Sequence, residues 1–600
     1  MSQAKYSVNQ HPISIVLAWI EQGEIAIPEI QRPFVWSKTQ VRDLMDSLLR
    51  GFPVGYLIAW KNPNIKLKDG STSEGKRILI DGQQRVTALM TAVSGMKVLD
   101  KNYKTTRIRI AYHPLEQKFE VLNRAIEKDS HWLPDISEAF KAGFKTHKFV
   151  GTYCEANPAA DEDTVFAGMD LLTSITTNQL GLIELDSSLD IETVTEIFIR
   201  INGKGAVLSQ ADFAMSKIAS NESYGGVEIR KTIDYFCHLA IAPEFYDTLV
   251  EGDPEFCQSD LFRAMSWLKR ENDDLYDPNY TDMLRVAFTS QFGRGKLQDL
   301  VALLSGRNFE TRSYEETIAM ASFEKLQTGL NAFMNEHNFK RYVMIIRSTG
   351  FIVSSLIGSG SALNFAYILY LHMRSLKIDQ NVIETTVRRW FVMSILTRRY
   401  SSNPETMFDL DIRRINERGP IKHLETIEEA DLSEGFWEFG LVQSLDTSVA
   451  SSPFFKLFLA AQIKANDKAF LSKDITVNDI VLNRGDLHHI FPKNFLKKNG
   501  FTRGRYNQIA NFAMTQTEIN IQIRDREPKV YFTDVVKQTT DNGEELSYGA
   551  IKTAQALSEN LAENSIPADL HEMTIEDYDT FLSNRRTLMA AKIKKYYQAL

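Results

Sequence analysis

The first hundred residues alternate between short apolar runs and amphipathic stretches, a pattern that predicts alternating strands and helices. The runs EIAIPEIQR (24–32), GYLIAW (55–60) and RILIDG (77–82) are typical of strands. The stretch SKTQVRDLMDSLLRG (37–51) has helical spacing, with Ser37 as the expected N-cap, Gln40 three positions on and Gly51 as the stop. We therefore expect an α+β or α/β unit at the start of the chain.

From Tyr224 to Gly440 the pattern is helical throughout, as in NVIETTVRRWFVMSILTRRY (381–400), and mixed structure returns afterwards. A chain of 600 residues predicts three or four domains, at about 100–200 residues each. We place three parts, at 1–223, 224–440 and 441–600. The predicted fold class is α+β with several domains, and the middle part is expected to be an all-α connector.

One stretch, STGFIVSSLIGSGSALNFAYILYLHM (348–373), is long and apolar enough to span a bilayer. The sequence GSGS (358–361) divides it, however, and its asparagine and serines are costly in lipid. We interpret it as two buried helices and expect no membrane partner.

Charge and cysteine content narrow the function class. Cys154, Cys237 and Cys257 are too widely spaced for a disulfide framework or a cysteine-rich zinc site, which favours a reducing compartment. The N-terminal sequence does not resemble a secretory signal. We therefore expect a cytoplasmic location. The net charge of −8 does not indicate a nucleic-acid partner. Two local clusters are nevertheless basic, one over 484–505 and one over 585–595.

The motif Asp81-Gly82-Gln83-Gln84-Arg85 follows a predicted strand and opens a predicted helix. Helix N-termini present free N–H groups to anions, and a guanidinium matches phosphate oxygens, so the motif suits a nucleotide. The alternative, that Asp81 caps the helix and Arg85 pairs on the surface, stays open. A nearby stretch, GSTSEGKR (70–77), nearly fits a phosphate-binding loop, but a strand follows it where a helix is required.

The segments QRPFVW (31–36), DGQQR (81–85) and FIRINGKGAVLS (198–209) together resemble the N-terminal domain of GmrSD-type restriction proteins, a ParB/sulfiredoxin-like fold. This resemblance implies that residues 1–223 bind and hydrolyse a nucleoside triphosphate. The residues implied in nucleotide binding are Asp81, Gly82, Gln83, Gln84, Arg85, Gln31, Arg32, Arg200 and Asn202.

Near the other end, GDLHHIFPKN (485–494) carries the adjacent residues His488 and His489, and Asn511 and Asn520 follow. A metal nuclease needs a cation at the scissile phosphate and a neutral imidazole to deprotonate water, and these residues suit both needs. A purely structural histidine pair is the alternative.

The same segment resembles the HNH, or ββα-metal, nuclease motif of GmrSD-type proteins. The resemblance implies that His489 is the general base, that His488 and Asn520 are metal ligands, and that Asn511 orients the loop of the base. Family members more often have an acidic residue where His488 stands, and imidazole suits transition metals better than Mg²⁺. The expected cofactor is therefore Mg²⁺ or a transition metal such as Mn²⁺.

The resemblance predicts a modification-dependent, type IV restriction endonuclease stimulated by a nucleotide. Its expected partner is double-stranded DNA, a homodimer is compatible with it, and the DNA-binding side chains are expected to be Lys493, Lys497, Lys498, Arg503 and Arg505. Two alternatives remain, a defence nuclease that senses phosphorothioated DNA and a DNA-binding sensor that does not cut. In the connector, Arg398, Arg399 and Tyr400 are candidates for phosphate or interdomain contacts, or simply end a helix.

Overall fold

The computed structural model describes residues 5–26, 36–61, 77–99, 105–189, 193, 210–219, 221–271, 273–483, 485–540 and 546–600. The chain divides into two compact units, which are described separately. Unit 1 contains residues 1–270 and 298–324, and unit 2 contains residues 271–297 and 325–600.

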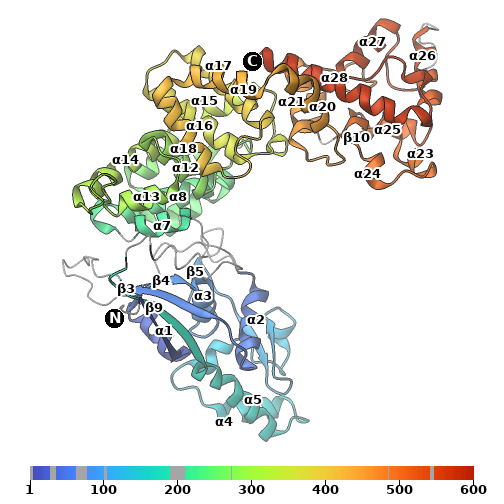
Figure 1. The fold of residues 1–600 in the computed structure, drawn as a ribbon. Coiled ribbons are helices and arrows are strands. Elements are labelled where there is room, and N and C mark those ends of the chain that lie inside the picture. The colour runs from blue at the N-terminus through green and yellow to red at the C-terminus, as the bar shows by residue number, and fades with distance from the viewer. Residues whose placement is uncertain are drawn as a thin grey trace. The chain divides into compact units, whose positions relative to one another are not determined.

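A mixed five-stranded sheet forms the centre of the N-terminal part of unit 1 (Figure 1). Its strands, in spatial order, are β1 (Tyr6–Pro12), β9 (Gln179–Leu185), β3 (Tyr56–Lys61), β4 (Arg77–Asp81) and β2 (Ile25–Ala26). β1 and β9 are antiparallel, as are β3 and β4, whereas β3 and β9 are parallel and so are β2 and β4. The chain therefore leaves β2 and β4 at the same end of the sheet.

Three helices pack on this sheet: α1 (Ile13–Glu21), α2 (Lys38–Leu49) and α3 (Gln83–Ala92). Their buried residues, including Val16, Leu44 and Val86, belong to one apolar core with the strands, and partly buried Trp36 packs against it. The predicted start of α2 is confirmed, because Ser37 and Gln40 form a reciprocal capping box. The apolar alternation of the strands and the capping of α2 thus help to fix the end of β4, where the Asp81 motif lies.

Shorter elements complete unit 1. The strands β5 (Val98–Leu99), β6 (Thr105–Thr106), β7 (Ile110–His113) and β8 (Lys118–Val121) form two small hairpins, and α4 (Thr146–Ala156) and α5 (Glu162–Ser174) precede β9. The helices α7 (Gln210–Ala219), α8 (Gly226–Ile241), α9 (Tyr246–Gly252), α10 (Pro254–Cys257) and α11 (Asp260–Ala264) follow. α13 (Leu297–Leu304) and α14 (Glu316–Met334) contain residues of both units.

The first part of unit 2 is helical in all its described elements. These are α12 (Tyr280–Phe292), α15 (Glu336–Arg347), α16 (Gly360–Ser375), α17 (Gln380–Leu396), α18 (Pro404–Arg418) and α19 (Pro420–Asp431). The expectation of two buried helices over 348–373 is wrong for its first half, where only the short 3-10 turn η7 (Ser354–Leu356) forms before Ser359 caps α16. Among the described residues, no helix is long and apolar enough to cross a membrane.

The last part of unit 2 mixes helices with a two-stranded sheet. It contains α20 (Leu441–Ser444), α21 (Pro453–Ala465), α22 (Val477–Leu482), β10 (Asp486–His489), α23 (Lys493–Lys498), α24 (Arg503–Tyr506), β11 (Phe512–Thr515), α25 (Thr517–Ile523), α26 (Pro528–Thr540), α27 (Ala554–Glu563) and α28 (Tyr578–Gln598). The mixed α+β, mostly helical class is confirmed. The three-part division at residues 223 and 440 stays a prediction, and residues on both sides of 440 share one compact unit.

Candidate functional site

The two predicted histidines lie on a small strand–strand–helix element. β10 pairs antiparallel with β11, so that His488 lies opposite Ala513 and His489 opposite Phe512. The chain turns directly from β11 into α25, which carries Asn520. Because neighbouring side chains of a strand point to opposite faces, His488 and His489 enter different surroundings.

His488 faces α25 and is 2% exposed. Its Nδ1 lies 2.7 Å from Oδ1 of Asn520, and its ring stacks on Phe470 with the two centroids 5.8 Å apart. The two side chains predicted as metal ligands, which are 32 positions apart in the sequence, are therefore brought into direct contact.

His489 lies on the other face, where it is half-buried. Its Nε2 is 3.0 Å from Oδ1 of Asn507, and the edge of its ring meets Phe512 at a centroid distance of 4.9 Å. In the tautomer that donates from Nε2 to this amide oxygen, Nδ1 keeps its lone pair and is the nitrogen that can accept a proton. Burial lowers the pKa of His489, nearby Lys493 lowers it further, and the bond to Asn507 opposes both effects, so the ring is neutral near neutral pH.

Asn507 was not predicted from the sequence. It is the residue that ends α24, and it reaches His489 only because the loop between β10 and β11 folds back on the end of β10. The sequence offers several asparagines between 494 and 520, and no local pattern distinguishes this one.

Asn511 is fully buried and ties three backbone groups together. Its Oδ1 accepts from the N–H of Phe491 at 2.8 Å. Its Nδ2 donates to the carbonyl oxygens of Phe491 at 3.0 Å and Tyr506 at 3.2 Å. Asn511 thus joins the segment that follows His489 to the segment that precedes Asn507.

Exposed basic side chains surround the open side of this element. Nζ of Lys493 and Nζ of Lys497 lie 5.8 and 5.6 Å from the ring centroid of Tyr506, which neighbours His489. Lys498 pairs with Asp525 at 2.5 Å, and Arg505 pairs with Asp579 at 2.6 Å. Arg503 is exposed on α24 beside them. A charge already engaged by a carboxylate has less to offer a phosphate, so Lys493, Lys497 and Arg503 are stronger candidates for phosphate contacts than Lys498 and Arg505.

His488 and Asn520 would be the ligands of a divalent metal, because an imidazole nitrogen and an amide oxygen are both metal-ligand types and the two side chains are in contact. Metal binding through Nδ1 of His488 would replace the hydrogen bond between them and require this nitrogen to be deprotonated. In the described part of the chain, no group of three or more His, Cys, Asp or Glu side chains could hold a metal.

Four of the basic side chains in the second cluster, near the C-terminus, are buried or paired within the protein, whereas Lys595 is exposed. Arg586 pairs with Asp446 at 2.5 Å, Lys594 pairs with Glu434 at 2.5 Å, and Lys592 pairs with Asp467. Arg585 is fully buried. Most of this charge is therefore engaged within the protein, and the larger group of exposed basic side chains, among the two described clusters, is the one beside His489.

The Asp81 motif lies where β4 ends and α3 begins. Gly82 is the N-cap of α3 at φ 92°, a left-handed conformation that suits glycine, and the register between β3 and β4 shifts at the same level. A Cβ at Gly82 would lie 2.3 Å from Cδ2 of Leu57. The backbone angle therefore favours glycine here, and a larger residue would also have to displace the buried Leu57 side chain.

Within the motif, Arg85 pairs with Asp81 through Nη2 at 3.1 Å and donates from Nη1 to the carbonyl of Val54 at 3.0 Å. Gln83 donates to the carbonyl of Leu79, and Gln84 also has a partner within the protein. Asp81 makes no side-chain cap, so the capping alternative is wrong, whereas the proposed pairing of Arg85 is present but partly buried. A phosphate would have to compete with Asp81 for this guanidinium.

Four other residues predicted to bind nucleotide, Gln31, Arg32, Arg200 and Asn202, lie outside the described residues.

In the connector, Arg399 and Tyr400 point into the protein. Arg399 donates from Nε to Asp411 at 2.8 Å, the Tyr400 hydroxyl donates to the same carboxylate at 2.8 Å, and His423 lies 3.1 Å from it. Asp411 is fully buried, and these partners hold the pKa of its carboxyl below the usual value against the effect of burial. A phosphate-binding role for Arg399 and Tyr400 is therefore wrong. Arg398 instead lies over Phe454 of α21, 4.9 Å from the ring centroid.

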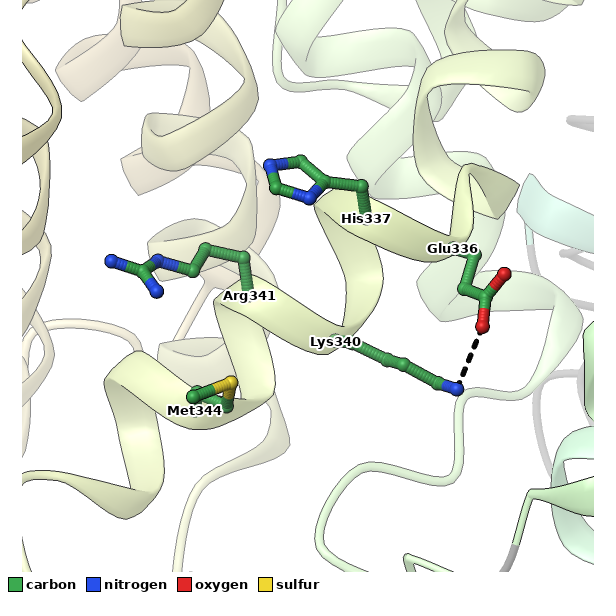
Figure 2. Close-up of a pocket in the computed structure, with 5 residues that line it drawn as sticks. All are labelled: Glu336, His337, Lys340, Arg341 and Met344. Carbon is green, nitrogen blue, oxygen red and sulfur yellow. Dashed lines mark hydrogen bonds and ion pairs between the residues drawn. The ribbon is translucent and has the colours of Figure 1, made fainter.

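A shallow pocket elsewhere in unit 2 is formed by α15 alone (Figure 2). It is lined by Glu336, His337, Lys340, Arg341 and Met344. Lys340 bonds to Glu336 at 2.8 Å, as the dashed line in Figure 2 marks, and Arg341 pairs with Glu384 of α17. The pocket's charges serve helix packing, and none of the predicted site residues lines it.

Residues 15–219 match the family model described as GmrSD restriction endonuclease, N-terminal domain. The chain is also 22% identical over 578 residues to the uncharacterized protein MJ0686 of Methanocaldococcus jannaschii, a match that covers 87% of this chain and 86% of that protein. The family match supports the expected relationship of the N-terminal part to GmrSD-type restriction endonucleases. It ends before the connector, so the assignment of the C-terminal element depends on that element's own geometry.

Proposed function

We propose that the protein is a metal-dependent DNA endonuclease of the GmrSD restriction type, in which an N-terminal sensor controls a C-terminal HNH-like nuclease. The observation that carries the nuclease proposal is the contact between His488 and Asn520 across β10 and α25, with His489 on the opposite face of the same strand. The match of residues 15–219 to the GmrSD N-terminal domain supports restriction as the biological role.

In the proposed reaction, His489 accepts the proton of the attacking water at Nδ1, because Asn507 occupies the Nε2 proton. His488 and Asn520 would hold a divalent metal, which stabilises negative charge on the scissile phosphate when bound. Lys493 and Lys497 attract the neighbouring phosphates of the backbone. Asn511 keeps the two ends of the loop between β10 and β11 in register.

The proposed nucleotide site is at the end of β4. The N-terminus of α3 follows Gly82, and its backbone N–H groups suit a phosphate. Binding would draw Arg85 from Asp81 to the phosphate, which would free the Asp81 carboxylate to bind a cation or orient a water. The exchange of one ion pair for another gives the sensor two states that a nucleotide can bias.

Modification dependence belongs to the proposal because sequence-independent cutting has to be restrained. The basic cluster beside His489 offers phosphates only charge, which carries no information on base modification. We therefore assign recognition of modified bases to the N-terminal part. Two other functions compete with this one, a nuclease that senses phosphorothioated DNA and a DNA-binding sensor that does not cut.

One set of cleavage assays tests these alternatives. The full chain should cut DNA with modified bases in the presence of Mg²⁺ or Mn²⁺, and a nucleoside triphosphate should stimulate the reaction. Preferential cutting of phosphorothioated DNA would favour the second function, and binding without cutting under every condition would favour the third.

Point variants then locate the chemistry. His489→Ala should abolish cleavage and leave nucleotide hydrolysis nearly intact, whereas His571→Ala, which changes a partly exposed histidine of the same unit, should leave both intact. Asn520→Ala should raise the metal concentration required. Cleavage that persists in the His489 variant would refute the assignment of the base.

Two variants of the N-terminal motif test the nucleotide proposal. Asp81→Ala and Arg85→Ala should each reduce nucleotide hydrolysis in a folded chain. Wild-type protein that neither binds nor hydrolyses any nucleoside triphosphate would leave the motif with a purely structural role.

A further inference from the structure

Arg585 of α28 is a buried cation whose hydrogen bonds go to backbone carbonyls. It is fully buried, and its Nη1 donates to the carbonyl oxygen of Ala510 at 2.7 Å while its Nη2 donates to that of Asn564 at 3.2 Å. Among the residues that the structure describes, its Nε has no hydrogen-bond partner, and burial lowers its pKa to about 9. A buried charge that no carboxylate neutralises is costly to the fold, so a large apolar side chain here would serve packing alone better.

One of the two carbonyls that Arg585 binds, that of Ala510, belongs to the residue directly before Asn511. Two further buried side chains also donate hydrogen bonds to backbone carbonyls close to the site. The Tyr531 hydroxyl of α26 donates to the carbonyl of Ile490, the residue after His489, at 2.9 Å. The Tyr578 hydroxyl of α28 donates to the carbonyl of Arg505, two residues before Asn507, at 2.9 Å.

These three donors hold the backbone directly after the proposed base and on both sides of its asparagine partner. Arg585 is distinct among them because its planar guanidinium joins two separate segments, at Ala510 and at Asn564, in one rigid group. A lysine has a single ammonium at this position and an apolar side chain has no donor, so neither reproduces both bonds.

We propose that Arg585 is a positioning residue of the nuclease site. It fixes the carbonyl of Ala510, and through it the Asn511 anchor that sets the loop carrying Asn507 against His489. This inference rests on the proposed nuclease function. Arg585 itself touches neither DNA nor the reacting atoms.

The test compares Arg585→Met and Arg585→Lys with Tyr596→Phe. Tyr596 is a matched control because it also lies on α28, is buried, and donates one hydrogen bond to a backbone carbonyl, that of Thr349, which is outside the site. In the Met variant kcat for DNA cleavage should fall by about tenfold to a hundredfold, as for other groups that orient a catalytic residue, while KM and DNA affinity stay within about twofold. The Lys variant should recover part of the loss, and Tyr596→Phe should keep the wild-type kcat.

A second measurement does not depend on activity. Amide hydrogen exchange across residues 487–511 should speed up in the Arg585 variants and stay unchanged in Tyr596→Phe. If Arg585→Met does not fold, Tyr531→Phe removes one bond to the same loop and should show the same loss of kcat and faster exchange.

The outcomes separate the two proposals. Wild-type protein that cuts no DNA overturns the proposed function and the positioning role with it. Active wild-type protein, with folded Arg585 variants that keep kcat or that change no more than Tyr596→Phe, overturns the positioning role alone.

Discussion

Replacing Asn511 should destabilise unit 2 in a way that depends on which of its hydrogen bonds is removed. Asn511→Ala removes one bond to the N–H of Phe491 and two from Nδ2 to carbonyl oxygens, all in a fully buried site. Each buried polar group left unpaired costs about 1–3 kcal/mol, and water that enters the vacated space offsets part of this. We expect a decrease of about 2–4 kcal/mol in the free energy of unfolding.

Asn511→Asp keeps the shape of the side chain and makes the effect depend on pH. When protonated, the new carboxyl can accept from the N–H of Phe491 and donate to one carbonyl, so less stability is lost than in the alanine variant. When ionised, it faces two carbonyl oxygens in a buried site, which raises its folded-state pKa above the unfolded value of about 3.9. The folded state then binds more protons than the unfolded state, so stability falls as pH rises, by about 1.4 kcal/mol per pH unit, until the folded-state pKa is reached.

Hydrogen exchange on the full chain can measure both variants, because the chain has two units and a single unfolding transition cannot be assumed. Peptides from β10 and β11 report the perturbed site, and peptides from β3 and β9 of unit 1 provide an internal reference. Asn511→Asp should protect its site better than Asn511→Ala at about pH 5 and less well at about pH 8. The role assigned to the three hydrogen bonds would be refuted if both variants kept wild-type protection from hydrogen exchange. It would also be refuted if the order of protection of the two variants were the same at both pH values.

Further predictions concern the other parts of the molecule. Gly82→Ala should lower the thermal stability of the chain by more than Gly23→Ala. Both glycines have positive φ, but of the two only Gly82 has a neighbouring atom that a Cβ would meet. Equal decreases in melting temperature would contradict the packing argument. Lys493→Gln combined with Lys497→Gln should weaken binding of modified and unmodified DNA alike. The slope of log K against log salt concentration should fall by roughly one for each phosphate that is no longer neutralised. Lys594→Gln, which removes an ammonium paired with Glu434, should change neither DNA binding nor this slope. Chelation of divalent metal should abolish cleavage while a mobility-shift assay still detects DNA binding, and cleavage that survives chelation would exclude a metal role.

Local chemistry was predictable from the sequence. The capping box of Ser37 and Gln40 depends on residues three positions apart, and it forms as expected. The strand that ends at Asp81 and the helix that follows Gly82 were also predictable from apolar periodicity and a single glycine. The α+β class follows from the same patterns.

Long-range partners were not predictable. Arg585 and Arg586 are neighbours in one basic run, yet the first is buried against carbonyls and the second pairs with Asp446, because their directions on α28 differ. Asn507 reaches His489 only through the fold of the loop between them. In the connector, Arg399 turns inward because α18 presents Asp411 to it, a partner that the sequence around Arg399 does not reveal.

The position of α28 in the chain bears on how the protein is made. Synthesis runs from the N-terminus, so β10, β11 and α25 (486–523) emerge from the ribosome before the helix that supplies Arg585 and Tyr578. A nascent chain, or one cut short before residue 578, lacks both donors to the loop that joins the two strands. The order of synthesis therefore delays completion of the proposed nuclease site until α28 has been translated.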